Sequence, residues 1–426
     1  MRPVRILRWV LGAVLLALSL AVVPSGAHAR TTDDDARQRQ ATGSADDRGQ
    51  REGAYRHACD PSPGLDKASC HSLISTDPAP LASVPPGGKP EGLTPRDLRS
   101  AYDLPRRAGE GRTVAVVVAF NYPTAENDLA VYRRQFHLPP CTTANGCFRE
   151  INQSGGTTPP PTTDPGWAVE AALDIEMVSA TCPTCNVLLV EANDDTIGNL
   201  LTAVAQARTQ GAKFISMSWG TDVEHPFQLV RDQTYFNHPG IAFVASSGDR
   251  GFPNLNWPAA SQFVTGVGGT RLERSRQPGW EPHGGQKPRR RGWLETAWPG
   301  AGSGCSLIQP KPPFQQDAGC TNRTVADVSA VAENVALYTT TPDAGWLTVA
   351  GTSVSTPIIA GVYALAGNPG PNDRPNSYPY ARPWALNDIV EGSNGSCGGS
   401  YLCTAVPGYD GPTGIGTPNG VRGFRA

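Results

Sequence analysis

The chain has 426 residues, of which 39% are hydrophobic and 17% charged, and its formal net charge is −2. A chain of this length can form one large α/β domain or two ordinary ones, and the 47 Gly and 40 Pro residues predict long loops. The near-neutral charge gives no electrostatic reason to expect binding to nucleic acid or to an anionic membrane.

The N-terminus predicts export from the cell. Three arginines precede the apolar run WVLGAVLLALSLAVV, and an A-x-A sequence ends at Ala29. A basic start, a short apolar core and small residues at the cleavage position describe a secretory signal over residues 1–29. The run is too short to span a membrane comfortably, and no other segment approaches that length. We therefore expect a secreted, extracellular protein without membrane contact after signal removal.

Residues 30–92 differ in composition from the rest of the chain. Residues 30–57 are polar and charged, with almost no large apolar side chains, so they cannot bury enough surface to offset the entropy of ordering. Residues 80–92 form a linker rich in Pro and Gly. We expect a largely disordered N-terminal segment over 30–92 and a folded domain over 93–426.

The ten cysteines fall in close sequential pairs, which fits an oxidising compartment. The Cys-Pro-Thr-Cys sequence at 182–185 also resembles half of a zinc site or a redox motif. It lacks a second C-x-x-C or an H-x3-H for zinc and the expected setting for redox work, so a structural disulfide is the better interpretation. The predicted disulfides are Cys59–Cys70, Cys141–Cys147, Cys182–Cys185, Cys305–Cys320 and Cys397–Cys403.

From residue 113 onwards, predicted strands and helices alternate. Continuous apolar runs such as TVAVVVAF at 113–120 are typical of strands buried in a parallel sheet. The stretch TIGNLLTAVAQARTQG at 196–211 has helical spacing and ends at a glycine. This alternation predicts an α/β fold, with a mostly parallel sheet flanked by helices and ligands at the carboxyl ends of the strands. Further strands are predicted at 186–192, 212–220, 241–249 and 263–270, and a further helix at 128–136.

The helix predicted within GWAVEAALDIEMVSA (166–180) carries two carboxylates on one face. Glu170 and Asp174 are four residues apart, hence one turn from each other, and their neighbours are apolar. Burial and mutual repulsion both raise a carboxyl pKa, so we expect the pair to share a proton and to accept a serine proton in acid. The alternative is an acidic helix face in contact with solvent.

A serine and a third carboxylate occur later in the chain. Ser353 lies in AGTSVSTPI, before a predicted helix with Pro357 in its first turn, where free backbone N–H groups favour negative charge. The alternative role for this serine is a helix N-cap. Asp249 ends the predicted strand IAFVASSGD; protonated, it can donate a hydrogen bond to an oxyanion, and otherwise it is a turn residue. No histidine begins a helix in a small-residue frame, so a Ser-His-Asp site has little support.

These features occur together in the sedolisin family, the serine-carboxyl peptidases, which the chain resembles from about residue 94 to its C-terminus. The resemblance implies a subtilisin-like fold and hydrolysis of peptide bonds through an acyl-enzyme, generally at acidic pH. It implies that Ser353 is the nucleophile, Glu170 the general base, Asp174 the residue that orients Glu170, and Asp249 the acid that stabilises the oxyanion. The matching stretches are G-T-S-x-S-x-P at 351–357, E-x3-D-I-E at 170–176, S-S-G-D at 246–249, ISMSWG at 215–220, VGGT at 267–270, GSGCS at 302–306, DVSAVA at 327–332 and GYDGPTGIGTP at 408–418.

The resemblance also implies one structural calcium ion near the C-terminus. Calcium prefers oxygen ligands, which suits Asp388 and Asp410 as carboxylates and Ile389 and Gly408 through their main-chain carbonyls. The family often has Gly where Val406 stands, and the added side chain is expected to disturb that loop.

Other positions depart from the family pattern. Arg250 follows Asp249 where a small residue is commoner, and a cation there is expected to lower the Asp249 pKa. Val118 stands where some relatives keep a further glutamate. The family usually carries a folded propeptide of well over a hundred residues. Here only residues 30–92 separate the predicted signal from the predicted domain. We therefore expect a member without a full-length propeptide.

The leading hypothesis is a monomeric, secreted endopeptidase that acts on peptide or protein substrates, with Ser353, Glu170 and Asp174 at its centre. Two alternatives remain open at this point. One is an exopeptidase that removes tripeptides, as some family members do. The other is a non-catalytic secreted binding or scaffold protein on a peptidase fold.

Overall fold

The computed structural model describes residues 55–61, 64–76, 89–275, 292–341 and 345–426. The expected signal at 1–29 lies outside these ranges. Within them, no helix combines the length and the apolar character needed to cross a membrane. The described residues belong to one compact unit, Gly53–Ala426.

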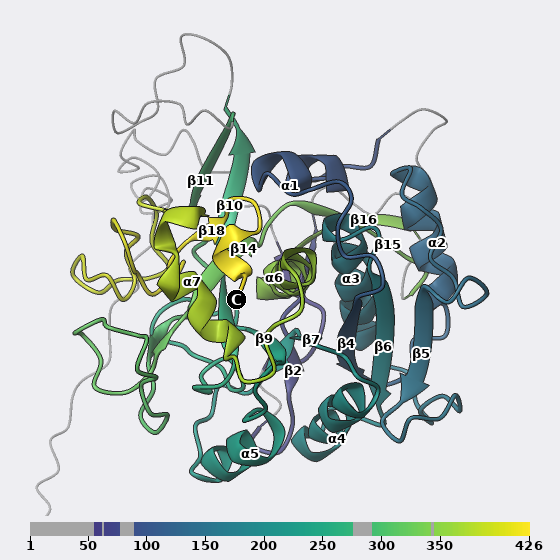
Figure 1. Cartoon of the computed structure of the whole chain (residues 1–426), viewed down its shortest axis with the longest axis horizontal. Helices are drawn as coiled ribbons and strands as arrows, with labels where there is room; N and C mark the ends of the chain where they lie inside the picture. The colour runs from purple at the N-terminus through teal and green to yellow at the C-terminus, as the bar shows by residue number, and fades with distance from the viewer. Residues whose placement is uncertain (1–54, 62–63, 77–88, 276–291, 342–344) are drawn as a thin grey trace, which may run out of the picture. The chain divides into compact units, whose positions relative to one another are not determined.

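A mostly parallel sheet forms the centre of this unit (Figure 1). Its strands follow the spatial order β11-β10-β9-β7-β4-β6-β5, and β14 also pairs with β10. Neighbours from β5 to β10 are parallel, as are β10 and β14, whereas β11 is antiparallel to β10. The predicted α/β architecture is therefore confirmed. The strands are β4 (Thr113–Ala119), β5 (Phe148–Asn152), β6 (Asn186–Ala192), β7 (Phe214–Met217), β9 (Ala242–Ser246), β10 (Thr265–Arg274), β11 (Trp293–Ala297) and β14 (Val328–Val331).

Helices pack against this sheet, and two of them, α3 and α6, lie side by side near the middle of the molecule (Figure 1). The start of α3 is fixed by Asp164, whose side chain accepts hydrogen bonds from the backbone N–H groups of Gly166 and Trp167. Residues 166–181 of α3 are all buried, so this helix has no face in contact with solvent. The helices are α1 (Pro95–Ala101), α2 (Ala125–Gln135), α3 (Pro165–Thr181), α4 (Ile197–Thr209), α5 (Phe227–Tyr235), α6 (Thr352–Ala366) and α7 (Tyr378–Ala381).

The expected domain start at residue 93 is wrong for the described residues before it. A second sheet has the order β1-β3-β16-β15, and β2 pairs with β8 elsewhere. Residues 55–57, 69–70 and 73–75 thus add strands to the folded unit through backbone hydrogen bonds. Backbone pairing of this kind needs few apolar side chains, which is why composition did not reveal it. These strands are β1 (Tyr55–His57), β2 (Ser69–Cys70), β3 (Leu73–Ser75), β8 (Trp219–Gly220), β15 (Val335–Thr339) and β16 (Gly345–Ala350).

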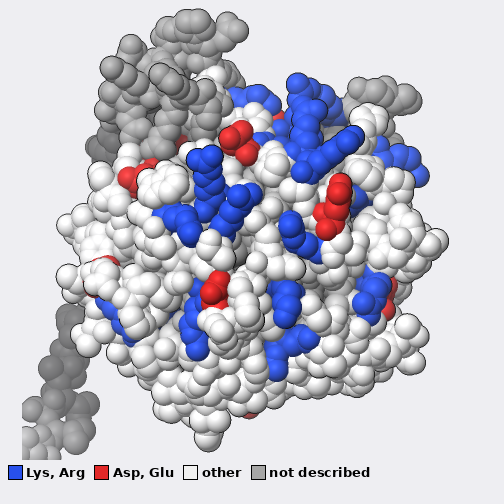
Figure 2. Space-filling model, in the orientation of Figure 1, with Lys and Arg blue, Asp and Glu red and all other residues white. Residues whose placement is uncertain are grey.

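The five predicted disulfides are all present, so the cysteine pairing inferred from sequence is confirmed and Cys182–Cys185 is a disulfide. Short antiparallel pairs add to the loop-rich C-terminal half: β12 (Gly304–Cys305) with β13 (Thr324–Val325), and β17 (Leu386–Asn387) with β18 (Thr417–Pro418). On the face shown in Figure 2, charged side chains are scattered over a mostly uncharged surface.

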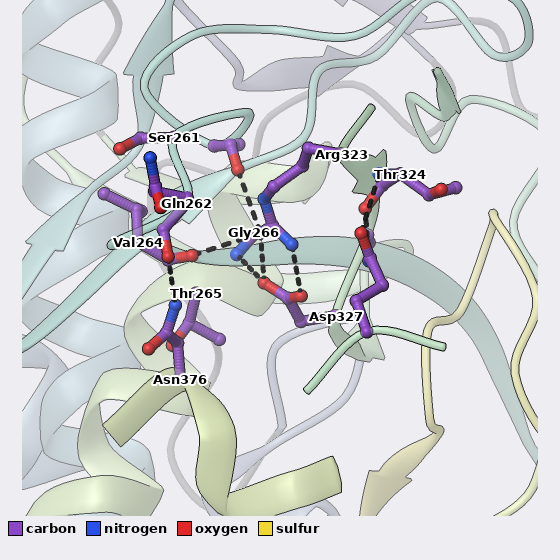
Figure 3. Close-up of polar contacts among 12 residues, drawn as sticks. Ser261, Gln262, Val264, Thr265, Gly266, Arg323, Thr324, Asp327 and Asn376 are labelled. Atoms are coloured by element: carbon purple, nitrogen blue, oxygen red, sulfur yellow. Dashed lines mark hydrogen bonds and ion pairs between the residues drawn. The ribbon is translucent and has the colours of Figure 1, made fainter. Parts of the chain in front are cut away.

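One motif of the sequence has a structural role. Asp327, the first residue of DVSAVA, forms an ion pair with Arg323 at 2.5 Å, and both side chains are fully buried (Figure 3). Asp327 also accepts a hydrogen bond from the Gly266 backbone N–H at 2.7 Å, and the Arg323 guanidinium reaches the Val264 carbonyl at 3.1 Å. Because these partners belong to the chain around β10, the buried pair ties the β14 region to the main sheet.

Candidate active site

Ser353 is the second residue of α6 and is fully buried. Its hydroxyl donates a hydrogen bond to the Ser218 carbonyl at 3.2 Å. Gly351 is the N-cap of α6 and has a φ of 115°, a backbone conformation that residues with a Cβ atom disfavour. Thr352 Oγ1 donates to Asp249 Oδ1 at 2.8 Å. The N-cap alternative for Ser353 therefore does not hold, since Gly351 occupies that position.

Glu170 and Asp174 lie on α3 and are both fully buried. Burial raises the pKa of Glu170 well above its usual range, and the Asp174 charge raises it further. Burial likewise raises the pKa of Asp174, opposed by a hydrogen bond from Ser218. That bond runs from Ser218 Oγ to Asp174 Oδ1 at 2.6 Å. The alternative of a solvated acidic helix face is excluded by this burial.

The Glu170 carboxyl faces Ser353. The hydroxyls of Ser353 and Ser72 lie beside it and partly offset the rise in its pKa. Neither hydroxyl closes a hydrogen bond of regular geometry with it, and both Glu170 carboxyl oxygens are buried without a partner among the described residues. A buried carboxylate with open acceptor positions next to a serine is suited to take its proton, since hydrogen bonds in resting sites are often longer than in the reacting complex.

Asp249 follows β9 at the carboxyl end of the main sheet. Its Oδ1 accepts from the backbone N–H and the hydroxyl of Thr352, both at 2.8 Å. Although part of the residue is exposed, Oδ2 is buried and has no partner in the described part of the chain. Burial raises the pKa of Asp249 to about 7, against the two Thr352 hydrogen bonds that lower it. Below that pH, Oδ2–H is a free donor.

Arg250 does not act on Asp249 as the sequence suggested. Its guanidinium forms an ion pair with Asp222 at 2.5 Å and contacts the Pro61 carbonyl. Burial, and not a neighbouring cation, determines the direction of the Asp249 pKa shift. The expectation that Arg250 lowers this pKa is therefore wrong.

Two functional residues were missed by the sequence analysis. Ser218 links the site, because its carbonyl contacts Ser353 while its hydroxyl contacts Asp174. It lies in ISMSWG, which was noted without a role for any residue. His71 lies in the cleft, with its carbonyl accepting from the Ser353 backbone N–H at 3.3 Å. Burial lowers the pKa of its ring to about 3, and no pattern in its surroundings in the sequence signals this position.

The four positions considered for calcium come together in two loops. The Gly408 backbone N–H donates to both Asp388 carboxyl oxygens, at 3.2 and 3.1 Å. Asp410 accepts from Thr413 through Oδ1 and from the Val406 backbone through Oδ2. Burial raises the pKa of Asp410 to about 7, and the Asp388 charge adds to the rise. Asp388 and Asp410 offer carboxylate oxygens, the ligand type that a hard divalent cation prefers, and Ile389, next in sequence to Asp388, is buried. Within the described ranges, no group of three or more His, Cys, Asp or Glu side chains gathers around a possible metal position.

The chain is similar to several known proteins. The chain matches the subtilase family over residues 163–390. Kumamolisin of Bacillus sp. (strain MN-32) is 28% identical over 370 residues, which cover 79% of this chain and 64% of the relative. Sedolisin of Pseudomonas sp. (strain 101) is 26% identical over 398 residues, covering 82% of this chain and 63% of the relative. The chain thus spans slightly less than two thirds of these relatives.

A third relative and a solved structure extend the comparison. Tripeptidyl-peptidase sed1 of Aspergillus fumigatus is 27% identical over 271 residues, covering 49% of this chain and 40% of the relative. The structure of Pseudomonas sedolisin, complexed with two molecules of pseudo-iodotyrostatin, aligns with a TM-score of 0.60 at 22% identity. That alignment covers 78% of this chain and 96% of the sedolisin chain, and it shows a shared fold.

Proposed function

This chain belongs to the subtilase family, as one of its sedolisin-type members, and from that premise we propose that it is a secreted serine-carboxyl endopeptidase. The single observation that supports this most is the buried cluster of Ser353, Glu170 and Asp174 between α6 and α3. A carboxylate pair with raised pKa values beside a helix-terminal serine has no evident structural use, because burying it is costly. Its proposed substrates are peptides or proteins, and we propose that it acts as a monomer.

In the proposed reaction, the Ser353 hydroxyl attacks the carbonyl carbon of a peptide bond and gives its proton to Glu170. Asp174, held by Ser218, orients and polarises Glu170. The negative charge that develops on the carbonyl oxygen is met by the Ser353 backbone N–H and by protonated Asp249. Glu170 then passes the proton to the leaving amine. Water hydrolyses the resulting ester of Ser353, with Glu170 again taking and returning a proton.

The proposed chemistry requires a protonated Asp249 and an ionised Glu170, and only the first of these requirements favours acid. Asp249 donates a hydrogen bond only when protonated, which the raised pKa of about 7 permits from neutral pH downwards. Glu170 must be ionised to accept a proton, and its burial makes it a stronger base than an exposed carboxylate. A carboxylate base still works at pH values where a histidine is already protonated and inactive as a base.

We also propose that Asp388 and Asp410, with the main-chain carbonyls of Ile389 and Gly408, hold one calcium ion. The repulsion between the two carboxyls supports this assignment. When bound, the ion would stabilise these loops and take no part in the proton transfers. Its proposed role is therefore structural.

The experiment that tests the function compares the wild-type chain with Ser353→Ala and Ser355→Ala on a mixed peptide library at pH 4. Ser355 is the matched control, since its hydroxyl bonds the Thr352 carbonyl within the same helix. We expect Ser353→Ala to abolish hydrolysis and Ser355→Ala to retain it. Hydrolysis by Ser353→Ala at the wild-type rate would refute the assignment.

A second comparison separates the endopeptidase from the tripeptidyl exopeptidase, which the similarity to tripeptidyl-peptidase sed1 keeps as a candidate. An endopeptidase cleaves peptides whose N-terminus is acetylated, whereas an enzyme that releases tripeptides requires a free N-terminus. We expect the acetylated and free forms of each peptide to be cut at the same internal bonds.

A further inference from the structure

A basic surface lies at the end of the molecule opposite the proposed active site, and we name it the arginine face. We propose that the arginine face docks on a membrane surface rich in anionic phospholipid. This inference goes beyond the proposed function and does not depend on it. The face consists of side chains that are exposed or half-buried, namely Arg106, Arg107, Arg112, Arg382, Arg422 and Arg425.

The C-terminal ends of α3 and α6 fix the position of this face. Arg112 donates to the Ala364 carbonyl in the last turn of α6, at 2.8 Å. The loop between α1 and β4, which carries residues 106 and 107, is held just beyond the end of α3. There the Thr184 hydroxyl donates to the Ala108 carbonyl at 2.5 Å. Both contacts lie at the helix ends that are farther from the proposed catalytic residues.

The last residues of the chain join the same end of the molecule. The Phe424 ring packs edge-to-face on Tyr363 of α6, with ring centroids 5.0 Å apart. The Arg382 guanidinium donates to the Arg425 and Ala426 carbonyls, at 2.6 and 3.0 Å. These contacts bring the C-terminal arginines of the face to the last turn of α6 as well.

The proposed nucleophile lies at the other end of the same helix. Ser353 is in the first turn of α6 and Ala364 in the last, so that eleven residues at about 1.5 Å each separate them by roughly 16 Å. The proposed site lies at the carboxyl ends of the sheet strands, whereas Arg112 directly precedes the amino end of β4. A protein docked through the arginine face therefore keeps its cleft open to substrate.

Positive charge dominates this face although the whole chain is close to neutral. In residues 95–112, Asp103 and Glu110 are the exposed acids. No Asp or Glu occurs in the two sequences that carry the C-terminal arginines, residues 378–385 and 419–426. Around the C-terminus marked in Figure 1, blue Lys and Arg side chains are more frequent than red Asp and Glu side chains (Figure 2). The net charge of −2, which gave no reason to expect an anionic membrane as partner, averages over this uneven distribution.

The arginines of this face repel their neighbours. Burial lowers the pKa of Arg99 on α1, and the charge of Arg106 lowers it further. Gathering like charges is unfavourable, and an anionic partner removes the repulsion. Arginine also suits a phosphate headgroup, because its planar guanidinium donates two parallel hydrogen bonds to phosphate oxygens.

An exposed tryptophan favours a lipid surface over a dissolved polyanion. Trp384 follows Arg382 by two residues and is 69% exposed, in a turn that packs against residues 422–424. Tryptophan is enriched at the headgroup level of membranes, because its ring has an apolar body and a polar N–H group. The arginines come from separate segments and form a face, whereas a single nucleic acid strand is typically bound in a groove. The contact we propose is peripheral, with lipid headgroups.

The test measures sedimentation of the full chain with vesicles of phosphatidylcholine, with and without phosphatidylglycerol. We expect wild type to bind only the anionic vesicles and to dissociate at high salt. The variant Arg106→Gln/Arg107→Gln should bind about 25-fold more weakly, since each arginine near an anionic surface contributes about fivefold. The matched control Arg56→Gln/Lys67→Gln removes the same charge from exposed positions beside residues 69–75 and should bind within about twofold of wild type. Trp384→Ala should bind more weakly than wild type at every salt concentration.

Three results would overturn the proposal: equal binding to neutral and anionic vesicles, wild-type affinity in the Arg106→Gln/Arg107→Gln variant, or an equal loss in the control. A single-stranded oligonucleotide that binds the protein when anionic vesicles do not would also overturn it, in favour of a nucleic acid partner.

Hydrolysis of an added peptide, measured on the same samples, tests the orientation of the docked protein. We expect vesicle-bound wild type to cleave the peptide at the rate of the free protein, because the cleft lies at the opposite end. A lower rate in the bound state would place the cleft against the lipid and overturn the assignment of this face. Protein that binds as expected but cleaves no peptide, bound or free, would overturn the proposed function and leave the docking surface standing.

Discussion

Asp249 offers the sharpest test of the proposed chemistry, because one of its carboxyl oxygens can be changed without moving the other. In Asp249→Asn, the amide oxygen can keep the two 2.8 Å hydrogen bonds from Thr352, while the NH2 group takes the place of the unpartnered Oδ2. The donor to the oxyanion is then present at every pH. Asp249→Ala removes the donor altogether.

The expected magnitudes follow from this geometry. Loss of one oxyanion donor lowers kcat about 10²- to 10³-fold, or roughly 3–4 kcal/mol, which is the loss we expect for Asp249→Ala. In the wild type the donor is lost as pH rises through the Asp249 pKa of about 7, because the folded protein holds the proton up to that pH. Activity should therefore fall above about pH 7, and in Asp249→Asn this decline should disappear.

The assay is a pH profile of kcat/KM between pH 3 and 9 on one internally cleaved peptide. Asp222→Asn is the matched control, since Asp222 lies in the same cavity but pairs with Arg250. We expect it to keep the decline near pH 7. If Asp249→Asn retained that decline, or if Asp249→Ala kept the wild-type kcat, Asp249 would not be the oxyanion donor.

Three further predictions concern the base, the metal and residues 69–75. In steady-state kinetics, Glu170→Gln should lower kcat about 10²- to 10⁴-fold. Glu176→Gln should keep the wild-type kcat, because Glu176 is buried on the same helix but accepts a hydrogen bond from the Tyr338 backbone. A chelator should lower the wild-type Tm and should not change the Tm of Asp388→Asn. If calcium was present at a hundredfold over its Kd, the loss corresponds to about 2.7 kcal/mol of stability. An unchanged wild-type Tm would exclude the ion. In the Ser353→Ala background, backbone amides of residues 69–75 should lose protection from hydrogen exchange between pH 7 and pH 4, and His71→Gln should preserve it, because glutamine gains no charge in acid.

The sequence was sufficient for the fold, and it singled out the candidate site residues, because the relevant signals are local. The buried strand TVAVVVA and the apolar helix around Glu170 are each recognisable from their own residues. The carboxylate pair is also a local signal, since two acids one turn apart on an apolar helix are unusual. Likewise, each disulfide joins cysteines at most 15 residues apart, so sequential pairing was correct.

The position of residues 69–75 could not be predicted in the same way. Ser69 to Ser75 carry no periodic apolar pattern, and their position is set by backbone hydrogen bonds to β8 and β16, which any extended chain can form. Ser218 was missed for a related reason, because one of its two contacts uses its carbonyl and not its side chain. Interactions made by the main chain leave little trace in residue identity.

The expectation that Arg250 lowers the Asp249 pKa was wrong for a physical reason that applies to the whole site. A cation next in sequence to a carboxylate lowers its pKa only if the two groups share an environment. Here the Arg250 side chain is directed to Asp222, while the Asp249 carboxyl is directed inwards to Thr352. The two residues lie in a bend after β9 and their side chains have different partners, so burial, opposed by the Thr352 hydrogen bonds, decides the direction of the Asp249 pKa shift.

Two titrating groups that line the same cavity, Asp249 and His71, respond to acid in a fixed order. Asp249 gains its proton once the pH falls below about 7. Burial lowers the pKa of docked His71 to about 3, from 6.5 for a free ring, against a hydrogen bond from Asn256 and with some help from the charges of His57 and Arg250. Docking of the ring is thus complete above pH 6.5 and weakens as the pH falls towards 3. Asp222, paired with Arg250, and Asp249 are the acids that line this cavity. Acidification therefore supplies the proposed oxyanion donor before it charges the docked His71 ring.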